Sequence, residues 1–216
     1  MKRCLVLAIF AVCASCAPCL AQTNAEFFYK ASGSNFFAGD FHAAISNLTR
    51  SVELDPRRAD AFFARGLCKH ELGEYSGAIA DYEKSIHLNS KTGGYYCGRG
   101  RAEFALKDWP AALADFNKAI ELDPTNSVAY FNRGTLRARV YTNLTEAIAD
   151  FDKALELHTD PREDDIFFSR GNAKADLKDF VGAIADYNKA LQINPNYALV
   201  RTNLAMAREA LRASKK

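Results

Sequence analysis

The sequence predicts an all-α fold, a right-handed superhelical solenoid of tandem helix–turn–helix units. The first observation is that one ten-residue segment recurs with small changes, as "GAIADYEKSI" at 77–86, "AALADFNKAI" at 111–120, "EAIADFDKAL" at 146–155 and "GAIADYNKAL" at 182–191. The second is that the first three copies of the longer unit are separated by 34 residues. The third is that small and aromatic residues within each copy recur at spacings of three and four, which places them on one helix face. Such repetition is typical of stacked supersecondary units.

Residues 1–21, "MKRCLVLAIFAVCASCAPCLA", differ in kind from the rest of the chain. A basic start at Lys2 and Arg3 precedes an apolar stretch, and small residues then lead to Ala21. This is the build of a secretory signal peptide, and its apolar stretch is short for a membrane span. We therefore expect a chain that is exported and periplasmic or secreted. The alternative is an uncleaved segment that anchors the chain in the inner membrane.

Removal of residues 1–21 changes the charge and the cysteine count. It takes away Lys2 and Arg3 and no acidic residue, which leaves 26 basic and 26 acidic residues. A balanced charge argues against nucleic acid or an anionic membrane as the main partner. Cys68 and Cys97 remain, too few for a disulfide framework, although a single disulfide between them stays an open alternative.

The repeat domain is expected over residues 22–195. It holds five units of helix, tight turn and helix, at 25–56, 59–90, 93–124, 127–159 and 164–195. Positions within each unit are numbered from 1. Position 20 is always alanine, position 8 is glycine or serine, and positions 4 and 24 are aromatic apart from Leu48. Small residues allow the two helices to approach closely, and large aromatic side chains fill the remaining space.

The ends of the expected helices carry their own signals. An acidic residue at position 16 precedes the second helix in four units, and an acid favours that end of a helix. A lysine or arginine at position 26 lies toward its other end, and proline at position 32 ends three units, as at Pro56. Residues 196–216 continue the register as a lone first helix, whose polar face suits a C-terminal cap.

These residues resemble the tetratricopeptide repeat (TPR), and the chain is similar to exported bacterial members of that family. The resemblance implies that the first helices line a concave groove that binds a peptide or helix of a partner protein. The sequence places a second set of aromatic and polar side chains on that face, beyond those of the core. The expected groove residues are Tyr29, Phe36, Phe37, Phe63, His70, Cys97, Arg101, Phe104, Phe131, Asn132, Arg139, Phe168 and Asn172.

Position 7 departs from the family pattern, which has leucine there. It is arginine in the last four units, the same units that carry aspartate at position 23, and the first unit lacks both. The joint loss favours pairing within a unit, as partly buried and bidentate ion pairs. The alternative is a row of anion-binding arginines. The expected pairs are Arg65 with Asp81, Arg99 with Asp115, Arg133 with Asp150, and Arg170 with Asp186.

No motif in the sequence indicates catalysis. The histidines stand alone, no cysteine pair has zinc spacing, and no serine lies in a nucleophile elbow. We therefore expect no catalytic residue, no metal and no cofactor. The expected function is a non-enzymatic, monomeric protein–protein interaction module that binds a protein or peptide and neither nucleic acid nor a small-molecule substrate. It contacts a membrane only if residues 1–21 are retained. The alternative function is an envelope scaffold or assembly subunit that self-associates or acts through its convex face.

Overall fold

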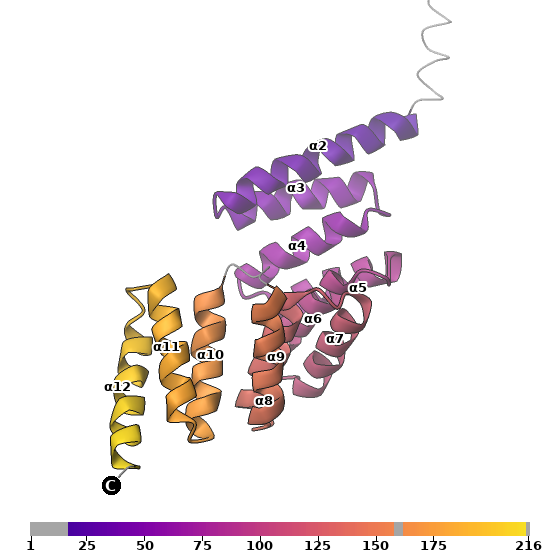
Figure 1. Cartoon of the computed structure of the whole chain (residues 1–216). Coiled ribbons are helices and arrows are strands. Elements are labelled where there is room, and N and C mark those ends of the chain that lie inside the picture. Colours follow the sequence, from indigo (N-terminus) through magenta and orange to yellow (C-terminus); the bar gives the residue numbers. More distant parts are fainter. Residues whose placement is uncertain (1–16, 158–161, 215–216) are drawn as a thin grey trace, which may run out of the picture. The chain divides into compact units, whose positions relative to one another are not determined.

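The computed structural model describes residues 17–157 and 162–214, with the backbone alone for residues 17–23. These residues form eleven α-helices and no β-strand, so the all-α prediction is confirmed. Helix–turn–helix pairs follow one another along the chain (Figure 1). Their bounds are α2 Ala17–Phe37, α3 Phe41–Leu54, α4 Ala59–Glu71, α5 Tyr75–Leu88, α6 Gly93–Ala105, α7 Trp109–Leu122, α8 Ser127–Arg139, α9 Leu144–Leu157, α10 Glu163–Asp176, α11 Phe180–Ile193 and α12 Ala198–Ala213.

The second helix of each pair begins where the acidic residues of the sequence indicate. Asp40, Asp108 and Asp179 are N-caps, and each carboxylate accepts a hydrogen bond from the backbone N–H three residues later. Glu74 is also an N-cap, but its longer side chain makes no such bond. The caps satisfy N–H groups that lack a partner inside the helix, so they fix the start of each second helix.

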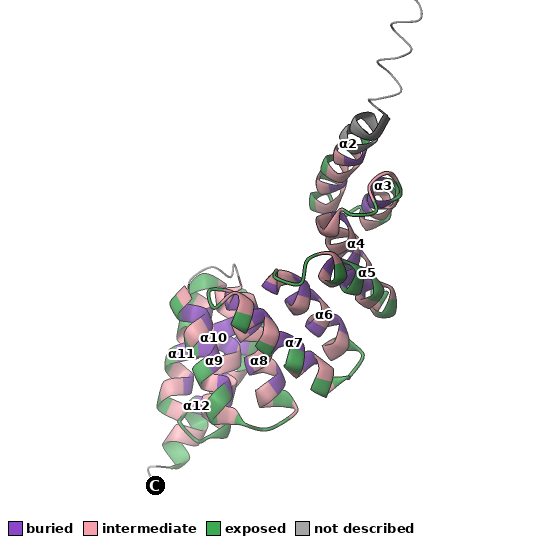
Figure 2. Ribbon diagram, turned by 90° about the vertical axis from the view of Figure 1, so that its right-hand side faces the viewer, coloured by how far each residue is buried: buried purple, intermediate pink, exposed green. Residues whose placement is uncertain are grey.

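The core of each pair lies where small residues let the helices meet. The alanines at position 20 are fully buried, and each helix carries buried as well as exposed residues (Figure 2). A Cβ added at Gly100 would lie 2.9 Å from Phe116 Cε1, and the other position-8 glycines are as close to the aromatic ring at position 24. The first repeat pairs Ser32 with the smaller Leu48. Glycine at position 8 is therefore required by the ring opposite it.

The chain divides into two compact units, each with its own packing. Residues up to Lys91 form the first, in which α2 to α5 pack consecutively. Residues from Thr92 form the second, in which α6 to α12 pack consecutively and the first helices α6, α8, α10 and α12 also touch in succession. Val200, Leu204 and Ala207 of α12 are buried against α11, while Arg201, Arg208 and Glu209 are exposed, as expected of a cap.

The expected signal peptide lies mostly outside the described residues, which begin at residue 17. The expected cleavage after Ala21 falls inside α2. None of the helices in the described ranges combines the length and the apolar character needed to cross a membrane.

Candidate functional site

Hollows lie between the first helices of neighbouring repeats in both units. In the first unit, α2 and α4 enclose a hollow of about 240 Å³, the α2–α4 hollow, with α3 at its floor. Its lining is mainly apolar and includes Tyr29, Phe36, Ala64 and Leu67. Gly33 also lines it, and a Cβ there would meet no atom within 4 Å. The α2–α4 hollow therefore has the shape and polarity to receive an apolar side chain.

The second unit has hollows of a more polar kind. The α8–α10 hollow, about 120 Å³, includes Arg139, Ser169 and Asn172. The α10–α12 hollow, about 470 Å³, also includes Asn172, together with Asp176 and Met206. The Asn172 side-chain oxygen accepts hydrogen bonds from the Tyr187 hydroxyl and the Asn203 amide, each at 2.8 Å. Asn172 is thereby held in place between the two hollows.

The expected aromatic stripe is packed more deeply than the sequence indicated. At position 5, Phe63 and Phe131 are half-buried, and each lies tilted against the position-24 ring of its own repeat. Phe168 is only 8% exposed, because Tyr187 and Tyr197 lie against it. The prediction that Phe168 lines a surface accessible to a partner was therefore wrong.

Cys97 was also wrongly predicted to line an accessible groove, since it is 5% exposed and packs with Ala119 and Ala129. Burial raises the pKa of its thiol to about 11, although Arg101 and Arg162 act in the opposite direction. Burial likewise raises the pKa of the Cys68 thiol to about 11. Both cysteines are free thiols, so the structure contains no disulfide between them.

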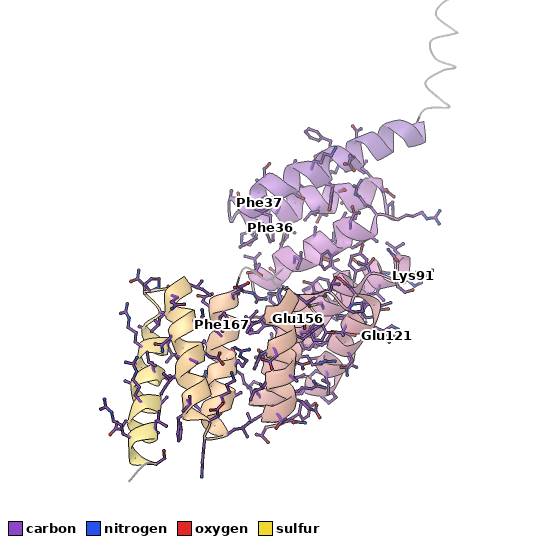
Figure 3. All side chains as sticks on the ribbon, viewed as in Figure 1. Phe36, Phe37, Lys91, Glu121, Glu156 and Phe167 are labelled. Carbon is purple, nitrogen blue, oxygen red and sulfur yellow. The ribbon has the colours of Figure 1, made fainter. Side chains whose placement is uncertain are left out.

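The position-12 rings of the first three repeats pack at the turn between the two helices. Phe36, His70 and Phe104 meet the position-17 ring of the next helix edge to face, at centroid distances of 5.5, 5.2 and 5.2 Å. All three side chains stay half-buried. Phe37, beside Phe36 at the end of α2, is 91% exposed (Figure 3). Part of the stripe therefore serves the core and part remains accessible.

Polar side chains of the expected groove gather around Cys97 in the second unit. Arg101 and Asn132 lower the pKa of the Cys97 thiol, and so does Arg162, which was not among the expected groove residues. The Arg162 guanidinium lies 5.0 Å above the ring of Phe131. Arg139 is exposed and lines the α8–α10 hollow, of which Arg101 is not a lining residue. The half-buried Arg101, Asn132 and Phe131 thus contribute a basic and aromatic surface on the first helices.

Each arginine at position 7 binds the aspartate of its own repeat. Arg65 donates from Nε and Nη2 to the two Asp81 carboxylate oxygens at 2.9 and 2.7 Å. The other three pairs are also bidentate, and the four aspartates are buried. The remaining Nη1 of Arg65 reaches Thr49 Oγ1 of the preceding repeat at 3.2 Å. Arg133 and Arg170 reach back in the same way, to Asn117 and Asp152.

A third side chain, at position 11, joins the arginine–aspartate pair in three repeats and was not predicted from the sequence. Position 11, one turn after the arginine, is basic in the second, fourth and fifth repeats. Its side chain contacts the same aspartate in each, as Lys69 with Asp81 at 2.7 Å. The signal was present, because positions 7 and 11 lie on one helix face and both carry bases in these repeats. The third repeat has Glu103 at position 11, and the first has Asn35.

Within the described ranges, no group of three or more histidine, cysteine, aspartate or glutamate side chains has the geometry of a metal site. The four buried aspartates of these ranges are engaged by the arginines of the repeats. The protonated thiols of Cys68 and Cys97 are poor nucleophiles.

Family models of the repeat match three parts of the chain. A "TPR repeat" model matches residues 100–139, and two "Tetratricopeptide repeat" models match residues 34–91 and 165–197. The chain is a tetratricopeptide repeat protein. No curated protein sequence matches it significantly.

Solved TPR structures share its fold. A thermophilic TPR protein of Thermus thermophilus, TTC0263, matches with a TM-score of 0.69 and 19% identity, over 85% of this chain and 98% of that one. YrrB, described as a TPR protein with an unusual peptide-binding site, has a TM-score of 0.59 and 23% identity, over 88% and 91%. The first TPR of Spaghetti (RPAP3), bound to the HSP90 peptide SRMEEVD, has a TM-score of 0.54 and 23% identity, over 56% and 95%.

Proposed function

We propose that this TPR protein is a non-enzymatic interaction module that binds peptide segments of partner proteins on the face formed by its first helices. The observation that carries the proposal is the position of the hollows, which lie between α2 and α4 in one unit and between α8, α10 and α12 in the other. Two TPR structures of the same fold, YrrB and the first TPR of Spaghetti, are described with a peptide site or a bound peptide.

The two units favour different parts of a ligand. The apolar lining of the α2–α4 hollow suits an aliphatic or aromatic side chain. On the second unit, the exposed Arg139 lines the α8–α10 hollow together with Ser169 and Asn172, which suits acidic and polar side chains. The preferred ligand is therefore a segment with apolar residues and at least one acidic residue.

The test uses a substitution that fills the α2–α4 hollow without disturbing the core. Gly33→Gln places a long side chain into open space inside a helix, where glycine itself is unfavourable. The matched control is Ser34→Gln, on the next and exposed residue of the same helix. Peptides selected from a displayed random library against the full chain should lose at least about tenfold in affinity with Gly33→Gln and keep it with Ser34→Gln. Equal affinity for both variants would contradict binding in this hollow.

Self-association is the competing function, and light scattering distinguishes it. We expect a monomer at concentrations at which the selected peptides bind. A stable dimer that selects no peptide would instead favour the scaffold. The proposed export is tested separately, by the N-terminus of the protein recovered outside the cytoplasm, which should be Gln22. That product would lack the first residues of α2, Ala17–Ala21.

A further inference from the structure

The position-11 side chain supplies a second donor to the buried aspartate in three repeats. In the second repeat, Asp81 Oδ2 accepts from Arg65 Nε at 2.9 Å and also from Lys69 Nζ at 2.7 Å. The same carboxylate oxygen receives two N–H donors in the fourth and fifth repeats. A buried carboxylate is favourable only when its lone pairs are satisfied, and the basic residue completes that set.

The third repeat places an acid where these donors lie. Asp115 Oδ2 accepts from Arg99 Nε at 2.7 Å, and Glu103 Oε1 lies 3.7 Å from the same nitrogen. The Glu103 side chain is 13% exposed, and its Oε2 is buried without a hydrogen-bond partner. An ionised carboxylate only accepts hydrogen bonds, whereas a protonated one also donates. Glu103 therefore supplies the second donor to Asp115 only when it carries a proton.

We propose that Glu103 is protonated in the folded third repeat and donates a hydrogen bond to Asp115, so that loss of this proton loosens the packing of α6 on α7. Two charges on the α7 side oppose ionisation of Glu103, those of Asp115 and of the N-cap Asp108. The favourable charge is Arg99 of α6, whose Nε and Nη2 are engaged by Asp115.

Helix α8, which also packs on α6, brings no further base to Glu103 among the described residues. Its Arg133 and Arg137 face the second helix of the fourth repeat, where both bind Asp150. Ionisation of Glu103 therefore leaves two carboxylates beside a single arginine, in a site that the protein buries. Like charges in such a site repel strongly and favour a shared proton.

The direction of the pH effect follows from these surroundings. Burial first, and then the charge of Asp115, raise the pKa of Glu103 from 4.5 to about 7. Between these values the folded chain binds more protons than the unfolded chain. Because stability falls with pH wherever the folded state binds more protons, the contribution of Glu103 is complete below about pH 4.5 and is lost as the pH rises through about 7.

Thermal unfolding of the full chain from pH 5 to pH 8 tests the proposal. In Glu103→Gln the amide donates to Asp115 at every pH, so this variant should lack the pH-dependent contribution. We expect the unfolding temperature of the natural chain to fall relative to that of Glu103→Gln by about 4 °C over this range. The control Glu121→Gln, at an exposed ion pair on α7, should run parallel to the natural chain. Parallel curves for Glu103→Gln and the natural chain would overturn the proposal.

A direct titration of Glu103 tests its protonation even if the Glu103→Gln variant folds poorly. The carboxyl carbon of Glu103 in the natural chain, observed by ¹³C NMR, should titrate with a midpoint near 7. Amide exchange in α6, measured against α10 at each pH, should rise through the same range, because α10 carries the basic Lys174 at the matching position. A midpoint near the ordinary 4.5 would refute the shared proton.

Discussion

The third and fifth repeats have the same buried arginine–aspartate pair but an acid in one and a base in the other at position 11. Both have a bidentate arginine–aspartate pair between their two helices, and both turns contain a lysine with φ of 65°. The difference is at position 11, where Lys174 binds Asp186 at 2.8 Å and Glu103 stands beside Asp115. The backbone accommodates either residue, so where position 23 is a buried aspartate the requirement at position 11 is a hydrogen-bond donor, which a lysine or a protonated glutamate can supply.

The first repeat shows a third solution, without any charge. Ala31 replaces the arginine, and Asn47 donates from Nδ2 to Asn35 Oδ1 at 3.0 Å. Positions 7, 11 and 23 therefore change together, and each combination leaves the buried polar group with a partner. The third repeat follows this rule only while Glu103 holds a proton. The stability of the third repeat should therefore depend on pH near neutrality.

The largest effect should come from removing the arginine in the two repeats compared above. Arg99→Leu leaves Asp115 beside Glu103 with two acids facing each other, so we expect a loss of about 3–5 kcal/mol of unfolding free energy at pH 7.5. Arg170→Leu leaves Asp186 bound to Lys174, and its loss should be about half as large. Chemical denaturation measures both. Lys153→Leu, at an exposed ion pair, is the control and should cost less than about 0.5 kcal/mol. Equal losses for the two arginines would show that position 11 does not matter.

The next effect should come from exchanging the position-11 side chains. Lys174→Glu turns the fifth repeat into a copy of the third, and we expect a loss of about 1–3 kcal/mol at pH 7.5. The loss should shrink at pH 5, because the new carboxyl then becomes protonated beside Asp186. Glu103→Lys should have the reverse effect and raise stability at pH 7.5. Chemical denaturation at pH 5 and pH 7.5 measures the unfolding free energy of both variants. If the loss in Lys174→Glu is the same at both pH values, the residue at position 11 does not explain the difference between the two repeats.

Most of the fold could be predicted from the sequence because its constraints are repeated. A single small residue near a ring is ambiguous, but Ala44, Ala78, Ala112, Ala147 and Ala183 in the same register are explained by one packing geometry. The arginine–aspartate pairs were predictable for a related reason. Their joint absence from the first repeat indicated the partner of each arginine.

The depth of the candidate site was not predictable, because it depends on neighbouring helices. Phe168 and Phe131 occupy the same position in their repeats, yet Tyr197 lies 5.2 Å from the Phe168 ring and helps to bury it. Glu103 was overlooked for a similar reason. A charged residue on a helix usually indicates a solvated face, and only the structure shows that this one lies against a buried carboxylate.

The smallest predicted effect tests whether the backbones of the third and fifth repeats are as alike as their turns indicate. Lys107 and Lys178 have φ of 65°, whereas the matching Gly39 and Gly73 have φ of 75° and 78°. A side chain in this left-handed region costs about 1–2 kcal/mol, of which the flexibility of glycine in the unfolded chain cancels a part. Lys107→Gly and Lys178→Gly should therefore each raise the unfolding free energy by up to about 1 kcal/mol, and Gly73→Lys should lower it. Denaturation measures all three. If the two substitutions raise the unfolding free energy by unequal amounts, the backbones of the third and fifth repeats differ in stability. The pH dependence of the third repeat could then no longer be assigned to Glu103 alone.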